Sequence, residues 1–192
     1  KCFVDTNGTT LLVFNDGVNA MKVSVWGKSE SASKTFSVPF AKKIFSDPYI
    51  ELDNKNNQLL FAGFYDNEVG MSEAAAYGFF YKTYDYTLGT LTNQSLTAFP
   101  DSFIQSLTGR LPSQNNNRLY TFSIKKVIQR MDGGVLIAAE SSIKDRREEP
   151  IVSLSSINPY TSYRTINTFQ YNDIIAFSIN ASGNLEWNSI MR

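Results

Sequence analysis

The sequence has 192 residues, with 18 basic and 18 acidic side chains, and it is rich in aromatic residues, with 14 phenylalanines and 10 tyrosines. This length can build one domain with a core, and the zero net charge argues against a nucleic-acid binder, which usually carries a basic stripe. Because histidine is absent and Cys2 is the only cysteine, the chain has no Ser-His-Asp or Cys-His catalytic set, no imidazole metal site and no internal disulfide, and we expect neither metal nor cofactor.

The first repeat of strands is predicted within residues 1–40. It begins with a short strand that turns back at Asn7-Gly8. Asn-Gly is a strong hairpin signal because both residues tolerate positive φ. Four strands are predicted here: 2–5, 9–15, 21–26 and 34–40.

The second repeat, within residues 41–100, has the same organisation and is followed by a helix. Its predicted strands are 48–52, 58–65, 78–85 and 90–98. A short helix is expected at 101–108, where Asp101 or Ser102 could cap the start and Gly109 could end it. The apolar residues of this segment, at helical spacing, form one stripe: Phe103, Ile104 and Leu107.

The third repeat, within residues 113–192, contains the clearest copy of the pattern. Its predicted strands are 118–130, 135–140, 173–180 and 184–191, and the first two join at the glycine pair Gly133-Gly134.

Three successive sets of four antiparallel strands, without strand–helix alternation, predict an all-β fold. We expect a single β-propeller segment: a β-propeller-like array of three four-stranded antiparallel blades, in the repeats 1–40, 41–100 and 113–192. Propellers typically close with four to eight blades. The chain is therefore expected to be part of a larger propeller, whose remaining blades come from a longer parent chain or from a partner that completes the ring. An ordinary β-sandwich is the alternative.

The third repeat resembles a known repeat family. In residues 173–187, an aspartate precedes alternating apolar residues, a short turn ending in Gly183, and then Leu185 and Trp187. This pattern resembles the bacterial SBBP-type β-propeller repeat. That family's second strand usually ends in Ala-Gly, which Ala62-Gly63 matches and the third repeat does not. The resemblance covers part of the third repeat and less of the others. In such a repeat, we expect Trp187 to pack between adjacent blades.

The resemblance implies an exported protein of bacteria such as the Bacteroidota, located in the periplasm, at the cell surface or outside the cell, in a family whose members mostly have no assigned activity. The chain starts at Lys1 without the charged and apolar regions of a signal peptide, so a signal is expected to have been removed or to lie upstream. No apolar run approaches the roughly 18 to 20 residues that span a bilayer, so no membrane span is expected.

Long loops are the best indication of function. In a propeller, the loops joining second and third strands emerge on one face together with the connections between blades. Here the segments 66–77, 99–117 and 141–172 are predicted as long loops on that face, and long loops on a rigid scaffold commonly bind ligands. The alternative is a self-packed loop in which the charged run 144–149 is solvated and internally paired.

Tyrosine and arginine are enriched at interface hot spots, so we predict that those in the loops contact a ligand or partner: Tyr77, Arg146, Arg147, Tyr160, Tyr163, Arg164 and Tyr171. The predicted function is a non-enzymatic scaffold for protein or glycan recognition. One alternative is a carbohydrate-active propeller, which would need two carboxylates about 5 to 10 Å apart, with four candidates: Glu140, Glu148, Glu149 and Asp173. Another is a purely structural element of a surface complex.

Overall fold

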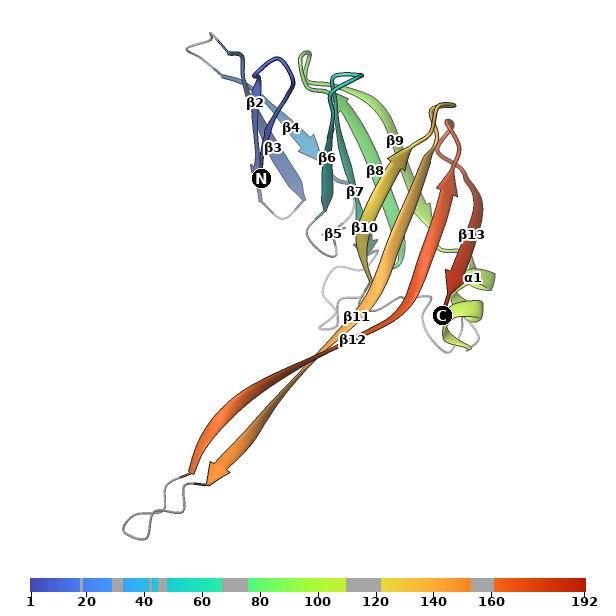
Figure 1. The fold of residues 1–192 in the computed structure, drawn as a ribbon. Helices are drawn as coiled ribbons and strands as arrows, with labels where there is room; N and C mark the ends of the chain where they lie inside the picture. The colour runs from blue at the N-terminus through green and yellow to red at the C-terminus, as the bar shows by residue number, and fades with distance from the viewer. Residues whose placement is uncertain are drawn as a thin grey trace.

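The computed structural model describes residues 1–17, 19–28, 33–41, 43–44, 48–66, 76–109, 122–152 and 161–192. These residues form three antiparallel sheets and one short helix, so the predicted all-β class is confirmed (Figure 1). Each sheet has a run of four strands paired in chain order, and none of the sheets closes on itself within the described residues.

The first sheet contains β1 (Cys2–Val4), β2 (Thr10–Asn15), β3 (Ala20–Trp26) and β4 (Lys34–Pro39). The second contains β6 (Tyr49–Asp53), β7 (Gln58–Asp66), β8 (Gly78–Asp85) and β9 (Thr90–Ala98), and a short unpredicted strand, β5 (Lys43–Ile44), also pairs with β7. The third contains β10 (Phe122–Gln129), β11 (Val135–Val152), β12 (Thr161–Ile179) and β13 (Leu185–Met191). The helix α1 (Asp101–Thr108) follows β9.

The second sheet is buried on both faces. Every residue from Leu59 to Tyr65 of β7 is buried, and β8 is almost as fully enclosed. A strand covered on both faces needs a continuous apolar run in place of alternation, and β7 carries such a run in its sequence. Gly63 interrupts this run of larger residues because a Cβ at this position would lie 2.7 Å from the ring of Phe80, its partner on β8.

Alternate residues of β7 and β8 contribute to two separate cores. The first inter-sheet core joins the first and second sheets through Leu11, Val13, Val23, Val25, Leu59, Phe61, Phe80 and Tyr84, among others. The second inter-sheet core joins the second and third sheets through Leu60, Ala62, Phe79, Tyr81, Ile137, Ala139, Ile175 and Phe177, among others. Phe79 and Phe177 stack across this second core with ring centroids 5.1 Å apart. Helix α1 adds Phe103 and Ile104 to it.

The prediction of a loop over residues 141–172 is wrong. Strands β11 and β12 continue through most of this segment, paired from Ser142 opposite Tyr171 to Val152 opposite Thr161. They form a two-stranded ribbon that projects from the body of the protein (Figure 1). The sequence 161–171 is rich in threonine, tyrosine and other residues that favour strands, which agrees with the extended pairing that the structure shows.

Two smaller expectations also differ from the structure. Helix α1 is where it was predicted and ends at Gly109 in the left-handed conformation, but its N-cap is Pro100, and no side chain caps it. Asp101 lies in the first turn instead, where its charge complements the helix dipole. Trp187 is not packed between sheets: it is 48% exposed, because β13 belongs to the last described sheet and faces solvent.

The two junctions between sheets repeat one contact. At each, the turn joining the third and fourth strands of one sheet rests on the fourth strand of the preceding sheet. At Gly89, a Cβ would lie 3.1 Å from the ring of Phe36 on β4. At Gly183, it would lie 3.3 Å from the Cβ of Ser95 on β9, and the Ser95 hydroxyl donates to the Gly183 carbonyl at 2.6 Å. The same kind of contact therefore joins the fourth strand of one sheet to the following sheet at both junctions.

This contact predicts a difference between two glycines of nearly equal backbone conformation. Gly183 has a φ of 84° and Gly17 a φ of 85°, but a Cβ at Gly17 would meet nothing within 4 Å. We expect Gly17→Ala to lower the free energy of unfolding by about 1–2 kcal/mol through backbone strain alone, and Gly183→Ala to lower it further because the neighbouring sheet must shift. Urea denaturation measures both, and equal losses would contradict the proposed contact.

A buried hydrogen bond also ties the first sheet to the second. The Tyr86 hydroxyl, in the β8–β9 turn, donates to Asp5 Oδ2 at 2.9 Å. Asp5 Oδ1 accepts from the backbone N–H groups of Asn7 and Thr9 at 2.8 and 2.7 Å. Burial acts to raise the pKa of Asp5, but the hydrogen bonds from Thr9, Tyr86 and Asn7 outweigh it and leave that pKa below its usual value. Burial, followed by the bond to Asp5, raises the pKa of Tyr86 to about 12.

The raised pKa of Tyr86 predicts a loss of stability in base. Because the unfolded tyrosine ionises near pH 10, its contribution is complete below about pH 10 and disappears as the pH rises towards about 12. The full effect corresponds to about 2–3 kcal/mol. We expect Tyr86→Phe to be less stable than the native chain at about pH 8 but to lose less stability between about pH 9 and about pH 12. Parallel stability curves for the two proteins would contradict this assignment.

Candidate functional site

The ribbon is the candidate site because it leaves the body of the protein and keeps its own backbone pairing. Among the described residues, β10 pairs with β11 only as far as Ser141, and β13 pairs with β12 only as far as Ile174. Beyond these points, β11 and β12 pair only with each other in the part of the chain that the structure describes. Each strand of the ribbon therefore has one edge whose backbone N–H and C=O groups pair with no third strand of the described chain.

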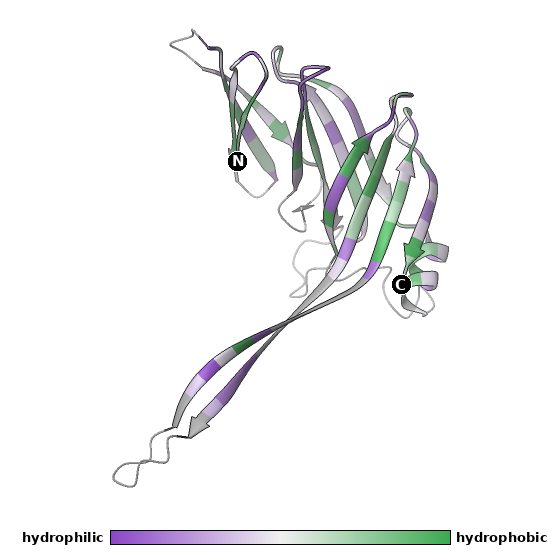
Figure 2. Ribbon diagram, viewed as in Figure 1, coloured by the Kyte–Doolittle hydropathy of each residue, from purple (hydrophilic) through white to green (hydrophobic). Residues whose placement is uncertain are grey.

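The composition of the ribbon explains why it does not fold back onto the sheets. Arg147, Glu148 and Glu149 are exposed and consecutive on β11, and successive strand residues point to opposite faces. Charge is therefore present on both faces, and burying either face would desolvate it. Figure 2 shows mostly hydrophilic colours on the described ribbon positions and hydrophobic positions along the strands of the body.

The register separates the ribbon's side chains into two faces. Glu149 lies opposite Arg164, and their carboxylate and guanidinium groups form an ion pair at 2.8 Å. Arg147 shares this charged face, two residues from Glu149. On the other face, Tyr163 lies opposite Pro150, and Tyr163 is 66% exposed. The result is an ion-paired face backed by an aromatic–proline face.

The predicted contact residues are therefore only partly brought together. Arg147 and Arg164 share one face of the ribbon, and Tyr163 lies on the other. Arg146 and Tyr171 occupy strand positions whose side chains the structure does not describe, and Tyr160 lies outside the described residues. Tyr77 is not on the ribbon: it is half-buried against the first inter-sheet core, with its ring centroid 6.1 Å from that of Tyr65. The sequence prediction missed Pro150, whose significance depends on a strand register that a loop does not have.

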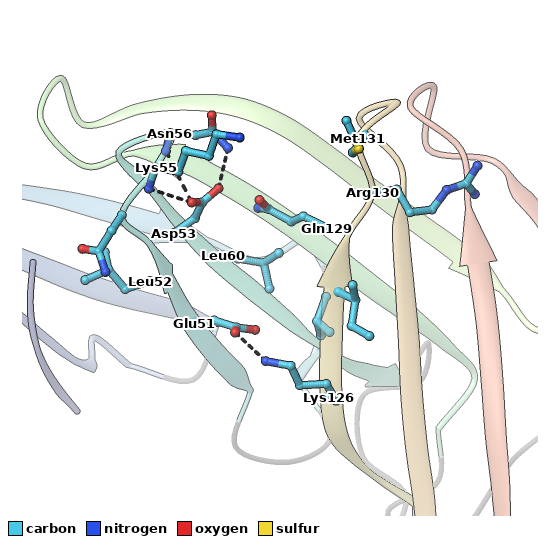
Figure 3. Close-up of a pocket in the computed structure, with 13 residues that line it drawn as sticks. Glu51, Leu52, Asp53, Lys55, Asn56, Leu60, Lys126, Gln129, Arg130 and Met131 are labelled. Carbon is cyan, nitrogen blue, oxygen red and sulfur yellow. Dashed lines mark hydrogen bonds and ion pairs between the residues drawn. The ribbon is translucent and has the colours of Figure 1, made fainter. Parts of the chain in front are cut away.

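A groove of about 530 Å³ lies between the first strands of the second and third sheets (Figure 3). Its walls are the segments 51–56 and 126–131. Lys126 points across it to Glu51, with Nζ and Oε1 2.6 Å apart, whereas Arg130 points away from it (Figure 3). The Arg130 guanidinium instead donates to the Ser178 hydroxyl at 2.6 Å and pairs with Glu186 and Asp132.

The acidic groups on the groove already have structural partners. Glu51 also accepts a hydrogen bond from the Tyr49 hydroxyl at 2.9 Å, and its bond with Lys126 raises the pKa of that lysine. Asp53 accepts from the backbone N–H of Lys55 at 2.9 Å and from the Asn56 amide at 2.6 Å, which holds the β6–β7 turn. These interactions connect the two sheets and shape the turn, so the groove is explained as a structural junction.

Among the described residues, Glu140 and Asp173 do not form the carboxylate pair that glycoside cleavage would require. Glu140 lies opposite Ile174, so Asp173, the neighbour of Ile174 on β12, points to the other face of the sheet. Glu140 instead pairs with Lys125 at 3.3 Å. Among the described residues, no cluster of three acidic or cysteine side chains could hold a metal ion. No helix in that part of the chain is long and apolar enough to cross a membrane.

Comparisons with known proteins do not place the chain in a family. No protein-family model matches it, and no curated protein and no solved structure gives a significant match. The resemblance to SBBP-type repeats therefore stays a prediction based on the sequence motif.

The exposure of the ribbon predicts that the body folds without it. Ile143 lies opposite Gln170, so residues 144–169 can be replaced by an Asn-Gly turn that closes the hairpin at this pair. The described ribbon side chains belong to neither inter-sheet core, and we expect the free energy of unfolding to change by less than about 1 kcal/mol. As a control, Ile137→Ala, at a fully buried position, should lose about 2–5 kcal/mol. A loss of that size in the ribbon-deleted variant would show that the ribbon is part of the core structure.

Proposed function

We propose that the chain is a non-enzymatic scaffold, a segment of a β-propeller-like array, that recognises a protein partner through its projecting ribbon. The observation that carries the proposal is the pairing of β11 and β12 far beyond the strands that flank them in the sheet. An isolated two-stranded ribbon is only marginally stable in water. A partner bound along it would supply packing contacts that the described part of the chain does not supply.

Two features of the ribbon favour a protein over a glycan as the ligand. Its outer edges offer backbone donors and acceptors, and an extended segment of another protein can pair with such an edge. Tyr163 and Pro150 together present an exposed ring and a rigid neighbour, which provide contact area at low entropic cost. Glu149 and Arg164 form an exposed ion pair at 2.8 Å on the other face, where a charged or polar partner group could exchange with either of them.

The propeller arrangement is supported by the way the sheets meet. The first strands of consecutive sheets lie close together: the Thr6 N–H, after β1, donates to Asn54 after β6, and Lys126 of β10 pairs with Glu51 of β6. Consecutive four-stranded sheets that pack face to face, with equivalent strands adjacent, are the arrangement expected of neighbouring propeller blades. Further blades would come from a longer parent chain or a partner. The proposed bacterial origin and export rest on the SBBP-like motif.

The ribbon can be tested by substitutions that leave the body intact. The site variant is Tyr163→Ala/Arg164→Ala, and the matched control is Asn167→Ala/Thr168→Ala, also exposed and on β12. Native chain, site variant, control and ribbon-deleted variant are each used as bait in an extract of the source organism and on a printed glycan array. Any captured protein is then purified, and its Kd for each variant is measured.

We expect one purified protein to bind the native chain and the control equally. It should bind the site variant at least about tenfold more weakly, which corresponds to about 1.4 kcal/mol, while the melting temperatures stay equal. Full binding by the ribbon-deleted variant would overturn the proposal. If the native chain bound only glycans, and the site variant lost that binding, the ribbon would remain the binding site but its ligand would be a glycan and not a protein.

A further inference from the structure

The third sheet repeats the geometry of the second, which allows their residues to be matched. In the second sheet, the ladder between the third and fourth strands pairs Thr83 with Asn93 and then skips to Tyr84 with Leu91. In the third, it pairs Ser178 with Trp187 and then skips to Ile179 with Leu185. The same irregularity at the same place aligns β8–β9 with β12–β13, and through them β7 with β11.

This match shows that the outer face of the third sheet corresponds to a buried face of the second. Leu60, Ala62, Phe79 and Tyr81 of the second sheet are buried against the third sheet in the second inter-sheet core. The counterparts of these four residues in the third sheet are again apolar: Leu136, Ala138, Ile174 and Ala176. No described sheet covers them, and Ile174 is 38% exposed. Phe64, a fifth buried residue of this face, corresponds to Glu140, which pairs with Lys125 at 3.3 Å.

The fourth strand extends this open face. Trp187 and Met191 of β13 share it, because they lie opposite Ser178 and Ile174, and they are 48% and 53% exposed. Ser189 corresponds to Ser95, the residue on which the glycine turn of the following sheet rests at the preceding junction. The outer face of the third sheet is therefore equivalent to the face of the second sheet that packs on the third sheet.

The first sheet presents the complementary surface. The second sheet packs one face on the first sheet, and the third sheet packs the equivalent face on the second. In the first sheet, the corresponding face carries Val4, Leu12 and Phe14, which are 60%, 38% and 46% exposed. The two kinds of face that meet at each junction between sheets thus each have an exposed equivalent, one on the third sheet and one on the first. Exposed apolar surface of this kind marks interaction sites.

We propose that the outer face of the third sheet of one copy binds the outer face of the first sheet of a second copy, head to tail. The occupant is a second copy because each open face corresponds to one side of a junction that the chain already makes internally. The charges named on these faces have partners within the chain. On the third sheet, Arg130 pairs with Glu186 and Asp132, and Glu140 pairs with Lys125 at 3.3 Å. On the first sheet, Lys22 lies 3.8 Å from Asp16. Contacts between unlike faces generate rings or open chains of copies.

Two variants, each blocking one face, test the proposal. Trp187→Lys blocks the third-sheet face and Phe14→Lys blocks the first-sheet face, while Leu88→Lys, at a turn residue that is 73% exposed, is the control. Circular dichroism and thermal unfolding establish that each variant is folded. Sedimentation equilibrium from about 1 µM to about 500 µM then measures the association of each variant and of an equimolar mixture of the two blocked variants.

A head-to-tail contact has a specific signature in this experiment. The native chain and the control should associate, and each blocked variant alone should associate at least about tenfold more weakly. The mixture should form a heterodimer that grows no further, because only one intact face remains on each molecule. A monomeric native chain, association that survives in either blocked variant, or a mixture that does not restore it would each overturn the proposal.

Discussion

The burial of the second sheet on both faces is the constraint on which the rest of the structure depends. Leu60 and Ala62 belong to one inter-sheet core, and Leu59 and Phe61, their neighbours on the same strand, belong to the other. Among the described residues, each outer sheet contributes to one of these cores only, so each is held through the central sheet. A change in the twist or register of β7 would alter both cores at once, which makes this strand the element that positions the first and third sheets.

The third sheet uses the same strands for two different purposes. Near the β10–β11 turn, Ile137 and Phe177 are fully buried in the second inter-sheet core. Further along β11, the charged residues Arg147 to Glu149 are exposed, and the described side chains of the ribbon belong to neither inter-sheet core. A register shift between Glu140 and Ser142 lies where the ribbon begins. A bulge at such a point bends and twists a strand, which is consistent with the ribbon leaving the body where the packing ends.

The sequence was most informative where burial imposes a pattern. Strands β8 and β9 have the predicted bounds, because apolar runs and turn residues mark both ends. The ribbon could not be recognised in the same way, because periodicity reports a buried face and the ribbon buries none among its described residues. Its only local signal was the strand preference of residues such as Thr165 and Ile166. The placement of Tyr163 and Arg164 on opposite faces of the ribbon could not be predicted, because it depends on the strand register. The exposure of Trp187 could not be predicted either, because it depends on which sheet is the last described one.

The continuity of β11 and β12 has a mechanical consequence. Both strands run without interruption from the second inter-sheet core into the ribbon, and antiparallel hydrogen bonds lie perpendicular to the strands. A pull on the ribbon along its axis would therefore load the ladders to β10 and β13 in shear, so that many bonds resist together. A sideways pull at β13 would open its ladder one bond at a time. The molecule should withstand tension far better along the ribbon than across its last sheet.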